Sequence, residues 1–378
     1  MAPSTDAYWL ALRRVRGVGP RICHLLIERF GSPERVFAAS EAEVAASGIP
    51  RPTAHNISEF HDFAPLEKEL CELPQLGARM VRWTDSDYPA NLRHIADPPP
   101  YFFLRGALAG NDPKFVAVVG ARAASDVGRR MAQRFGLELA AKGFTVVSGL
   151  ARGIDSEAHQ GALDGRGRTV AVMGCGIDVI YPPENRKLAQ AIIDNGGALI
   201  SELPVGTPPM AENFPARNRL ISGLCLGVVI VEAAEKSGSL ITARMALEQD
   251  RQVFAVPGSP LTGKTRGSNR LLKEGARLVE CVEDVIEELA PQLTVGPSAA
   301  ETGHAVEAGR RRGAEISIES ESNEVKTVLS YLKNIDKLHV DSIIENSGLN
   351  AQTVLKLLLE LELRGLVTQH PGKLFSLA

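Results

Sequence analysis

Cysteine is scarce in this sequence, and the cysteines present are not arranged as a metal site or a disulfide framework would require. There are five in 378 residues, an odd number, and neither a CxxC pair nor a histidine at metal-ligand spacing accompanies them. We therefore expect reduced structural thiols, no zinc and no other metal. The five are Cys23, Cys71, Cys175, Cys225 and Cys281.

Long apolar runs and an excess of positive charge are also missing. No stretch reaches the roughly 18 consecutive apolar residues that a membrane-spanning helix needs. Residues 1–6 lack the basic and apolar regions of a secretory signal, so we expect a cytoplasmic protein. The formal net charge of −3 argues against a wholly basic nucleic-acid binder, although a local basic groove is compatible with it. Aromatic residues make up only 5%, so any contacts to nucleic-acid bases should be few.

What the sequence does contain is a regular alternation of short apolar strands and amphipathic helices. This alternation predicts an α/β domain with a doubly wound parallel sheet, an extended Rossmann-like fold. Two further strand-like runs within 78–108 surround a proline-rich region and predict an edge extension of that sheet. The strands begin near Lys114, Thr145, Thr169, Ala198, Val228 and Val253, and the helices include Pro183–Asn195, Ser239–Asp250 and Asn269–Gly275.

Segments of different character flank this core, and the length alone favours several domains. Residues 1–75 have helical spacing interrupted by the hairpin Gly17-Val18-Gly19-Pro20, which resembles a helix-hairpin-helix or SAM-like module. In DNA-binding versions the hairpin N–H groups meet phosphates, but a small helical packing module explains the pattern equally well. The arginines nearby are Arg13, Arg14, Arg16 and Arg21.

The C-terminal part divides into a linker and a small domain. Residues 291–320 are rich in Gly, Ala, Ser and charge without periodicity, which indicates a flexible linker. Residues 321–378 predict three amphipathic helices and two strands, a winged-helix layout. This segment has 6 Lys or Arg against 7 Asp or Glu, so it favours protein contact over phosphate contact. The expected domains are therefore 1–75, 76–290 and 321–378, with the linker before the last.

The stretch from Phe115 to Asp155 reads as strand, loop, helix, strand, loop. Both strands end in glycine-bearing loops that lead into helices, whose first N–H groups lack internal partners and attract phosphate. Each loop also contains an arginine, whose forked guanidinium suits phosphate oxygens. The predicted anion ligands here are Gly120, Arg122, Gly149, Arg152 and Gly153.

Two later stretches place further polar groups at the same edge of the sheet. Arg217 and Asn218 precede the apolar run that enters a central strand, where they would face the strand ends. Small residues then open the next helix and expose N–H groups and hydroxyls. Several phosphate sites side by side suit a polyanion, so we add Lys236, Ser237, Gly238 and Ser239.

A phosphate-loop pattern occurs at Gly258–Thr265, GSPLTGKT, so a nucleotide hydrolase has to be considered. We disfavour it because Arg266-Gly267-Ser268 separate the Lys-Thr pair from the following helix, and because no strand ends in an aspartate for magnesium. Lys264 is kept as a possible point-charge contact to DNA. Asp155 is interpreted as a helix N-cap and His159 as structural, so no catalytic residue is expected.

Ordered motifs between Tyr88 and Ala276 closely resemble the DNA processing protein A (DprA, or Smf) family. They include YPANL, VAVVGAR, VVSGLARGIDSEAH, FPARNRLISGL, VVIVEAAEKSGSLITARMALEQ and GSNRLLKEGA. The resemblance implies a non-catalytic, cofactor-free dimer that binds single-stranded DNA during natural transformation and loads the recombinase RecA. It also implies DNA contacts by Arg122, Gly149, Arg152, Gly153, Arg217, Asn218, Ser237 and Gly238.

Two departures from the family pattern affect the predicted site. Many relatives have Ser where Ala121 stands and Lys where Pro183 stands, so one phosphate contact is either missing or supplied by Arg186 or Lys187. A second alternative function is a nucleotide phosphoribohydrolase of the lysine-decarboxylase-like group, which shares this type of sheet. Its PGGxGTxxE loop is absent where EAAEKSGSLITARMALE stands.

Overall fold

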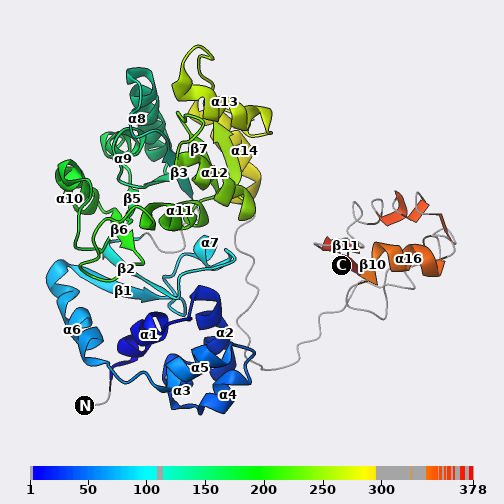
Figure 1. Ribbon diagram of the computed structural model, residues 1–378. Helices are drawn as coiled ribbons and strands as arrows, with labels where there is room; N and C mark the ends of the chain where they lie inside the picture. Colours follow the sequence, from blue (N-terminus) through cyan, green and yellow to red (C-terminus); the bar gives the residue numbers. More distant parts are fainter. Residues whose placement is uncertain are drawn as a thin grey trace, which may run out of the picture. The chain divides into compact units, whose positions relative to one another are not determined.

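The chain forms two compact units, Met1–Ala300 and Glu301–Ala378, each with its own core (Figure 1). They are described separately below from a computed structural model. The residues that the structure describes are 3–108, 114–294, 325, 338–347, 349–350, 353–354, 356–358, 361, 367–370 and 374–377.

A nine-stranded sheet organises the first unit, in the order β1-β2-β6-β5-β4-β3-β7-β8-β9. The strands from β3 to β9 are parallel, whereas β2 pairs antiparallel with both β1 and β6. This confirms the predicted doubly wound sheet with an edge extension. The strands are β1 (Ala78–Arg82), β2 (Tyr101–Gly106), β3 (Phe115–Val119), β4 (Thr145–Ser148), β5 (Thr169–Val172), β6 (Ala198–Ser201), β7 (Gly227–Ile230), β8 (Gln252–Ala255) and β9 (Arg277–Leu278).

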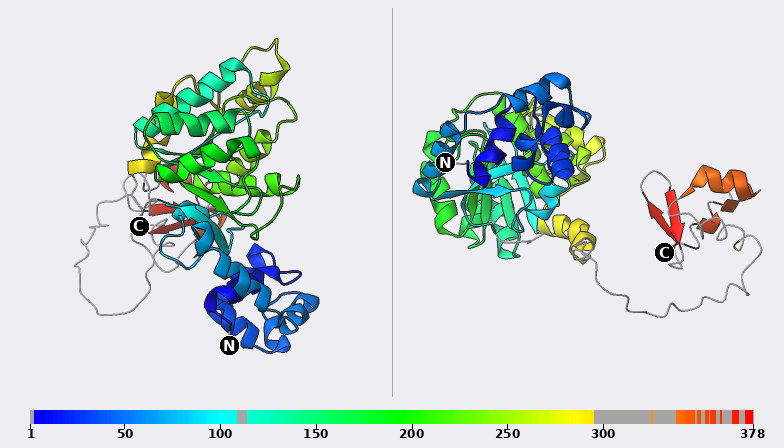
Figure 2. Two further views of the ribbon diagram at one scale, coloured as in Figure 1. Left: turned by 90° about the vertical axis from the view of Figure 1, so that its left-hand side faces the viewer. Right: turned by 90° about the horizontal axis from the view of Figure 1, so that it is seen from below.

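Helices cover both faces of this sheet, and the central strands are therefore apolar along their whole length (Figure 2). One face packs against α8 (Asp126–Ala141), α9 (Ile154–Asp164) and α14 (Val282–Thr294). The other packs against α11 (Asn213–Leu224) and α12 (Ser239–Glu248). The remaining helices of this part are α7 (Ala90–Arg93), η2 (Pro183–Asn185), α10 (Arg186–Asp194), η3 (Gly263–Thr265) and α13 (Arg266–Lys273).

Three boundaries differ from the sequence-based expectation. The run at 213–224 is helix α11 rather than the approach to a strand, because Leu220, Ile221 and Leu224 form a buried helical stripe. Helix α13 begins at Arg266, so no gap separates it from the GKT triplet. Helix α14 continues to Thr294, into the expected linker, and 295–320 lie outside the described residues.

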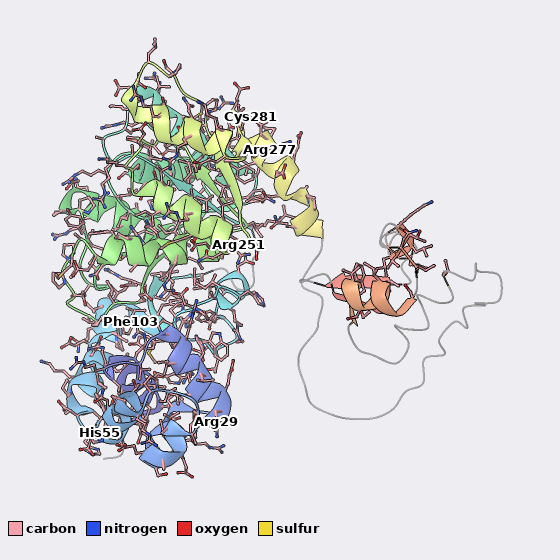
Figure 3. The ribbon with its side chains drawn as sticks, turned by 45° about the vertical axis from the view of Figure 1, so that its right-hand side comes forward. Arg29, His55, Phe103, Arg251, Arg277 and Cys281 are labelled. Atoms are coloured by element: carbon pink, nitrogen blue, oxygen red, sulfur yellow. The ribbon has the colours of Figure 1, made fainter. Side chains whose placement is uncertain are left out.

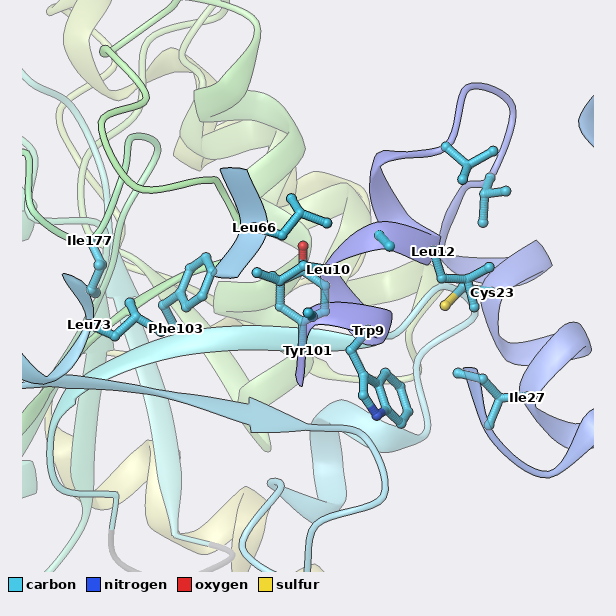
Figure 4. Packing of buried hydrophobic residues seen from close by; sticks show 14 of the residues in the cluster. Trp9, Leu10, Leu12, Cys23, Ile27, Leu66, Leu73, Tyr101, Phe103 and Ile177 are labelled. Atoms are coloured by element: carbon cyan, nitrogen blue, oxygen red, sulfur yellow. The ribbon is translucent and has the colours of Figure 1, made fainter. Parts of the chain in front are cut away.

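The helical segment at the start of the chain shares its core with the edge of the sheet. Trp9 and Leu10 are buried in the same apolar cluster as Tyr101 and Phe103 (Figure 4). The His24 imidazole also bonds the Pro98 carbonyl oxygen, with Nε2 and O 2.9 Å apart. The helices are α1 (Thr5–Arg14), α2 (Pro20–Phe30), α3 (Pro33–Ala38), α4 (Glu41–Ala45), α5 (Arg51–Ser58), α6 (Ala64–Glu72) and η1 (Pro74–Leu76).

The second unit contains a three-stranded antiparallel sheet in the order β10-β12-β11. Helix α16 (Val340–Ser347) follows β10 (Leu338–His339), and β11 (Val367–His370) pairs with β12 (Leu374–Leu377). Buried side chains from these elements, including Ile343, form the core of this unit. Parts of the other two predicted helices lie outside the described residues. In the described parts of both units, no helix is long and apolar enough to cross a bilayer.

Glycines permit the close approach of α8 and α9, which leads to the first prediction. A Cβ on Gly161 would lie 2.0 Å from the Gln133 carbonyl oxygen, and one on Gly136 would lie 2.3 Å from that of Ala158. Gly161→Ala should therefore destabilise the protein by about 1–3 kcal/mol, despite the higher helix propensity of alanine. Urea unfolding measures the change in the free energy of unfolding.

The matched control is Gly263→Ala, because a Cβ there meets nothing within 4 Å. The control should change the free energy of unfolding by less than about 0.5 kcal/mol. Equal effects of the two substitutions would contradict the packing argument.

Candidate functional site

Strand β3 marks the point where the strand order of the sheet reverses. Helix α8, which follows β3, packs on one face, whereas α12, which follows β7, packs on the other. The loops after these two strands therefore diverge and open a crevice at the carboxyl edge, where doubly wound proteins bind ligands. A pocket of about 650 Å³ lies in this crevice.

The structure brings most of the predicted ligands together in this pocket. Gly149 and Arg152 line a small adjoining hollow that shares Arg122 with it. Gly153 forms the turn behind it: its φ is +76°, and a Cβ there would lie 2.4 Å from the Ala121 carbonyl oxygen. The predicted residues that line the main pocket are Gly120, Arg122, Arg217, Asn218, Lys236, Ser237, Gly238 and Ser239.

A buried carboxylate and a buried guanidinium fix the loop after β4. The Asp155 carboxylate accepts a hydrogen bond from the Gly149 N–H at 3.1 Å, and Arg217 Nη1 donates to the Gly149 carbonyl at 3.0 Å. A Cβ on Gly149 would lie 2.6 Å from Arg217 Nη2 and 2.7 Å from Asp155 Oδ2, so only glycine fits. The expected N-cap role of Asp155 is wrong: the N-cap of α9 is Gly153, and Asp155 lies inside the first turn.

Arg217 is a fixed part of the wall rather than a mobile side chain. It is 4% exposed, and burial lowers its pKa to about 10, although the Asp155 carboxylate acts in the opposite direction. It therefore stays protonated at neutral pH. Within the described part of the chain its Nε has no hydrogen-bond partner, even though the residue lines the pocket. A buried, incompletely paired cation favours an anionic ligand.

The start of α8 is not the open phosphate site that the sequence predicts. The Ser125 hydroxyl caps this helix by accepting from the Gly128 N–H at 3.0 Å. The Ser125 N–H and hydroxyl in turn donate to the buried Glu232 carboxylate, which occupies the place of an anion. Helix α12 has no side-chain cap from its N-cap Gly238, but its first N–H groups are also paired. The Ser239 N–H donates to the Ser237 hydroxyl oxygen, and the Leu240 and Ile241 N–H groups donate to the Ser237 and Gly238 carbonyls. What the start of α12 adds to the pocket is therefore the Ser237 and Ser239 hydroxyls, which lie 2.8 Å apart.

Two exposed arginines of the site, Arg122 and Arg152, have an aromatic and an acidic neighbour respectively. The Arg122 guanidinium carbon lies 5.2 Å from the centre of the Phe214 ring, which in turn lies 5.6 Å from the Tyr181 ring. The sequence analysis did not predict this aromatic pair. The one signal in the sequence was that Phe214 begins the FPARNR motif and that Tyr181 follows a strand-end loop. Arg152 forms an ion pair with Glu184, and this hydrogen bond lowers the pKa of the Glu184 carboxyl.

Some expected contacts lie elsewhere. Lys264 is exposed in the loop after β8 and is not among the residues that line the pocket. The same is true of Arg186 and Lys187, which are exposed on α10. In the described residues, no group of three or more His, Cys, Asp or Glu side chains is placed to hold a metal ion.

The GSPLTGKT loop is bonded to itself, which is a better reason against a phosphate cradle than the gap expected from the sequence. Asn269 accepts from the Gly258 N–H at 3.0 Å and donates to its carbonyl at 2.8 Å. The Thr265 hydroxyl donates to the Ser259 carbonyl at 2.7 Å. These contacts use the loop donors and the hydroxyl that a bound nucleotide and its metal would need.

A doubly wound sheet with a positively charged pocket at its switch point defines a Rossmann-like anion-binding protein. The comparisons with known proteins go further. Residues 79–290 match the family model for DNA recombination-mediator protein A, and 314–373 match that for the DprA winged helix domain. The chain therefore belongs to the DprA/Smf family, whose model describes a recombination mediator.

Relatives from several bacteria match over much of their length. Protein Smf of Synechocystis sp. is 35% identical over 98% of this chain and 98% of its own, and DNA processing protein DprA of Streptococcus pneumoniae is 44% identical over 60% and 78%. The X-ray structure of the S. pneumoniae protein aligns with a TM-score of 0.66 at 35% identity, over 76% of this chain and 99% of that one. A DprA structure from Helicobacter pylori, described as showing a single-stranded DNA binding mode, aligns at 0.51 and 30%, over 57% and 96%.

The buried His159 on α9 yields the second prediction, which concerns pH. Its Nδ1 lies 2.7 Å from the Thr169 hydroxyl oxygen, and burial lowers its pKa to about 3. In the unfolded chain the imidazole titrates near 6.5, so between these values the folded protein binds fewer protons and stability rises with pH. Below about pH 6 we expect His159 to contribute a loss of about 1.4 kcal/mol per pH unit.

Urea unfolding at several pH values checks this expectation. His159→Gln should remove that part of the slope, whereas His94→Gln, at an exposed position, should leave it in place. A slope that is the same in His159→Gln and in the parent protein would show that the buried imidazole is not the group that titrates.

Proposed function

We propose that this protein binds single-stranded DNA taken up during natural transformation and loads RecA onto it, without catalysing a reaction and without a cofactor. The observation that supports this most directly is the pocket at the switch point, which Arg122, Arg217 and Lys236 line together with the hydroxyls at the start of α12. Membership of a recombination-mediator family and the binding mode described for the H. pylori relative point the same way.

The pocket offers a single strand two kinds of contact. Arg122 and Lys236 are exposed and able to reach phosphate oxygens, while the buried Arg217 supplies a fixed positive charge. Beside Arg122, the Tyr181 and Phe214 rings provide aromatic surface against which bases can stack. Paired bases cannot turn their faces toward such a surface, so duplex DNA should compete poorly for this pocket.

The remaining predicted residues have supporting roles in this proposal. Gly120, Gly149 and Gly153 shape the backbone where a Cβ would clash, and Asn218 Nδ2 donates to the Gly238 carbonyl at 3.4 Å, which ties α11 to the start of α12. Ser237 and Ser239 supply hydroxyls. Lys264 would meet the strand only beyond the pocket.

Arg152 is available to DNA only if it exchanges partners. It pairs with Glu184 at the surface, where both side chains are more than half exposed. Exposed ion pairs are weak because water and salt screen them. A phosphate of the bound strand can therefore replace the Glu184 carboxylate as the partner of Arg152. In the absence of DNA, Arg152 stays paired with Glu184.

The third prediction tests the DNA site through its salt dependence. Arg122→Ala and Lys236→Ala should each weaken binding of a fluorescent oligothymidine and lower the salt slope by about 0.7, the value for one lost phosphate contact on a single strand. Phe214→Ala should weaken binding by about 1–3 kcal/mol at an unchanged slope, because it removes stacking and not charge.

Arg186→Ala is the matched control, since it removes the same charge from an exposed position that does not line the pocket. It should leave both affinity and slope unchanged. The DNA site would have to be placed elsewhere if Arg122→Ala and Lys236→Ala behaved like this control.

The fourth prediction concerns RecA and the homodimer, which the family resemblance implies. If RecA and DNA contact different surfaces, Arg122→Glu should abolish binding of single-stranded DNA and still retain RecA in a pull-down. Light scattering of the same variant should report a dimer. Loss of RecA association by this variant, with its thermal unfolding unchanged, would show that the two surfaces overlap or that association requires DNA.

A further inference from the structure

The helical segment at the start of the chain contains the same hairpin twice. Gly17 and Gly48, 31 positions apart, both have positive φ, at 94° and 85°. Each is followed by a buried apolar residue, and each precedes by three positions the first residue of a helix, α2 or α5. The correspondence continues along the two helices in buried pairs at the same separation: Val18 and Ile49, Cys23 and Ala54, Leu26 and Ile57.

Direct contacts join the first hairpin to the helix that follows the second. Asn56 Nδ2 on α5 donates to the Arg16 carbonyl at 3.0 Å. A Cβ on Gly17 would lie 2.6 Å from the Thr53 hydroxyl oxygen, so the hairpin backbone rests on the first turn of α5. Arg13 Nη1 holds the same hairpin from the other side by donating to the Val18 carbonyl at 2.9 Å. The two hairpins therefore belong to one rigid arrangement.

Acidic residues are absent around both hairpins and are concentrated in the stretch that follows each of them. Residues 7–27 and 44–58, which contain the hairpins, have no Asp or Glu, whereas 28–43 and 59–72 contain nine. Arg16, Arg21 and Arg51 are exposed beside the hairpins. In the described part of the chain none of the three forms an ion pair, and the N–H groups of Gly19 and Ile49 donate to no protein acceptor. The carboxylate that contacts α5, Glu41, is bonded to His55 at 3.0 Å.

We propose that the paired hairpins form a second DNA-binding surface, which holds the phosphate backbone of duplex DNA. Unpaired arginines and free N–H groups are the donors that contact phosphates without reading sequence. Neither 15–21 nor 46–52 contains an aromatic residue, so the surface has no platform for unpaired bases. Two hairpins held rigidly fit a partner whose phosphates are also rigidly spaced. This surface is distinct from the strand-end pocket and does not depend on the function proposed for it.

The double variant Arg21→Glu/Arg51→Glu of the full chain tests the proposal. Its affinity for a fluorescent blunt-ended duplex should fall at least about tenfold, and the salt slope should fall by about 1.8, the value for two lost contacts to B-DNA. Its affinity for oligothymidine should stay within about twofold. Arg122→Glu should show the reverse pattern, losing the single strand and keeping the duplex.

The matched control is Arg29→Glu/Arg35→Glu, which also reverses two arginine charges. Both positions are exposed, on α2 and α3, and lie away from the hairpins; Arg29 is labelled in Figure 3. It should leave both affinities unchanged, and thermal unfolding should confirm that both double variants fold. Unchanged duplex binding by Arg21→Glu/Arg51→Glu overturns the proposal, as does an equal loss of duplex and single strand. If Arg122→Glu keeps its single-strand affinity, the pocket proposal fails and the duplex result stands on its own.

Discussion

The strand-end site depends on one buried electrostatic arrangement, in which Asp155 and Arg217 hold the two sides of the Gly149 peptide. Asp155 comes from the helix after β4, and Arg217 comes from α11, more than 60 residues later in the chain. The two residues bond the Gly149 backbone and not each other, but their opposite charges offset part of the cost of burying both. The loop geometry therefore requires both residues, and it admits no side chain at Gly149 itself.

This arrangement separates the charges of the site into fixed and mobile ones. Arg217 lies in the wall and keeps the local potential positive, whereas Arg122 and Lys236 project from loops and can adjust to a flexible polyanion. Carboxylates occupy two of the places where the sequence suggests free phosphate donors: Glu232 at the start of α8 and Glu184 on Arg152. In the proposed function such a pocket would bind a phosphate backbone, because its cations are spread along a crevice and not gathered around one small anion.

Two arginines of α11 show which roles the sequence motif cannot predict. Arg217 and Arg219 stand two positions apart in the same motif, yet Arg217 lines the pocket while Arg219 pairs with Glu202 and donates to the Asp97 carbonyl at 2.9 Å. Their positions in the motif do not separate these roles, since the partners come from distant parts of the chain. The second hairpin was missed because Pro50 stands where the first hairpin has Gly19, although Gly48-Ile49 repeats the glycine and apolar residue of Gly17-Val18.

Residue patterns alone were enough to predict the doubly wound sheet, its edge extension and the family, because strand and helix periodicity and ordered motifs are local properties of the chain, whereas the antiparallel pairing of that edge came from the structure. The residue patterns also placed the glycine-rich loops at one sheet edge, since parallel strands all end on the same side. The three-dimensional contacts show in addition that Glu232 occupies the start of α8, that Arg217 is buried, that Tyr181 packs near Phe214 and that Lys264 lies outside the pocket. Each of these outcomes depends on a residue from a distant part of the chain. Burial or capping by such a residue cannot be predicted from the periodicity of the local sequence.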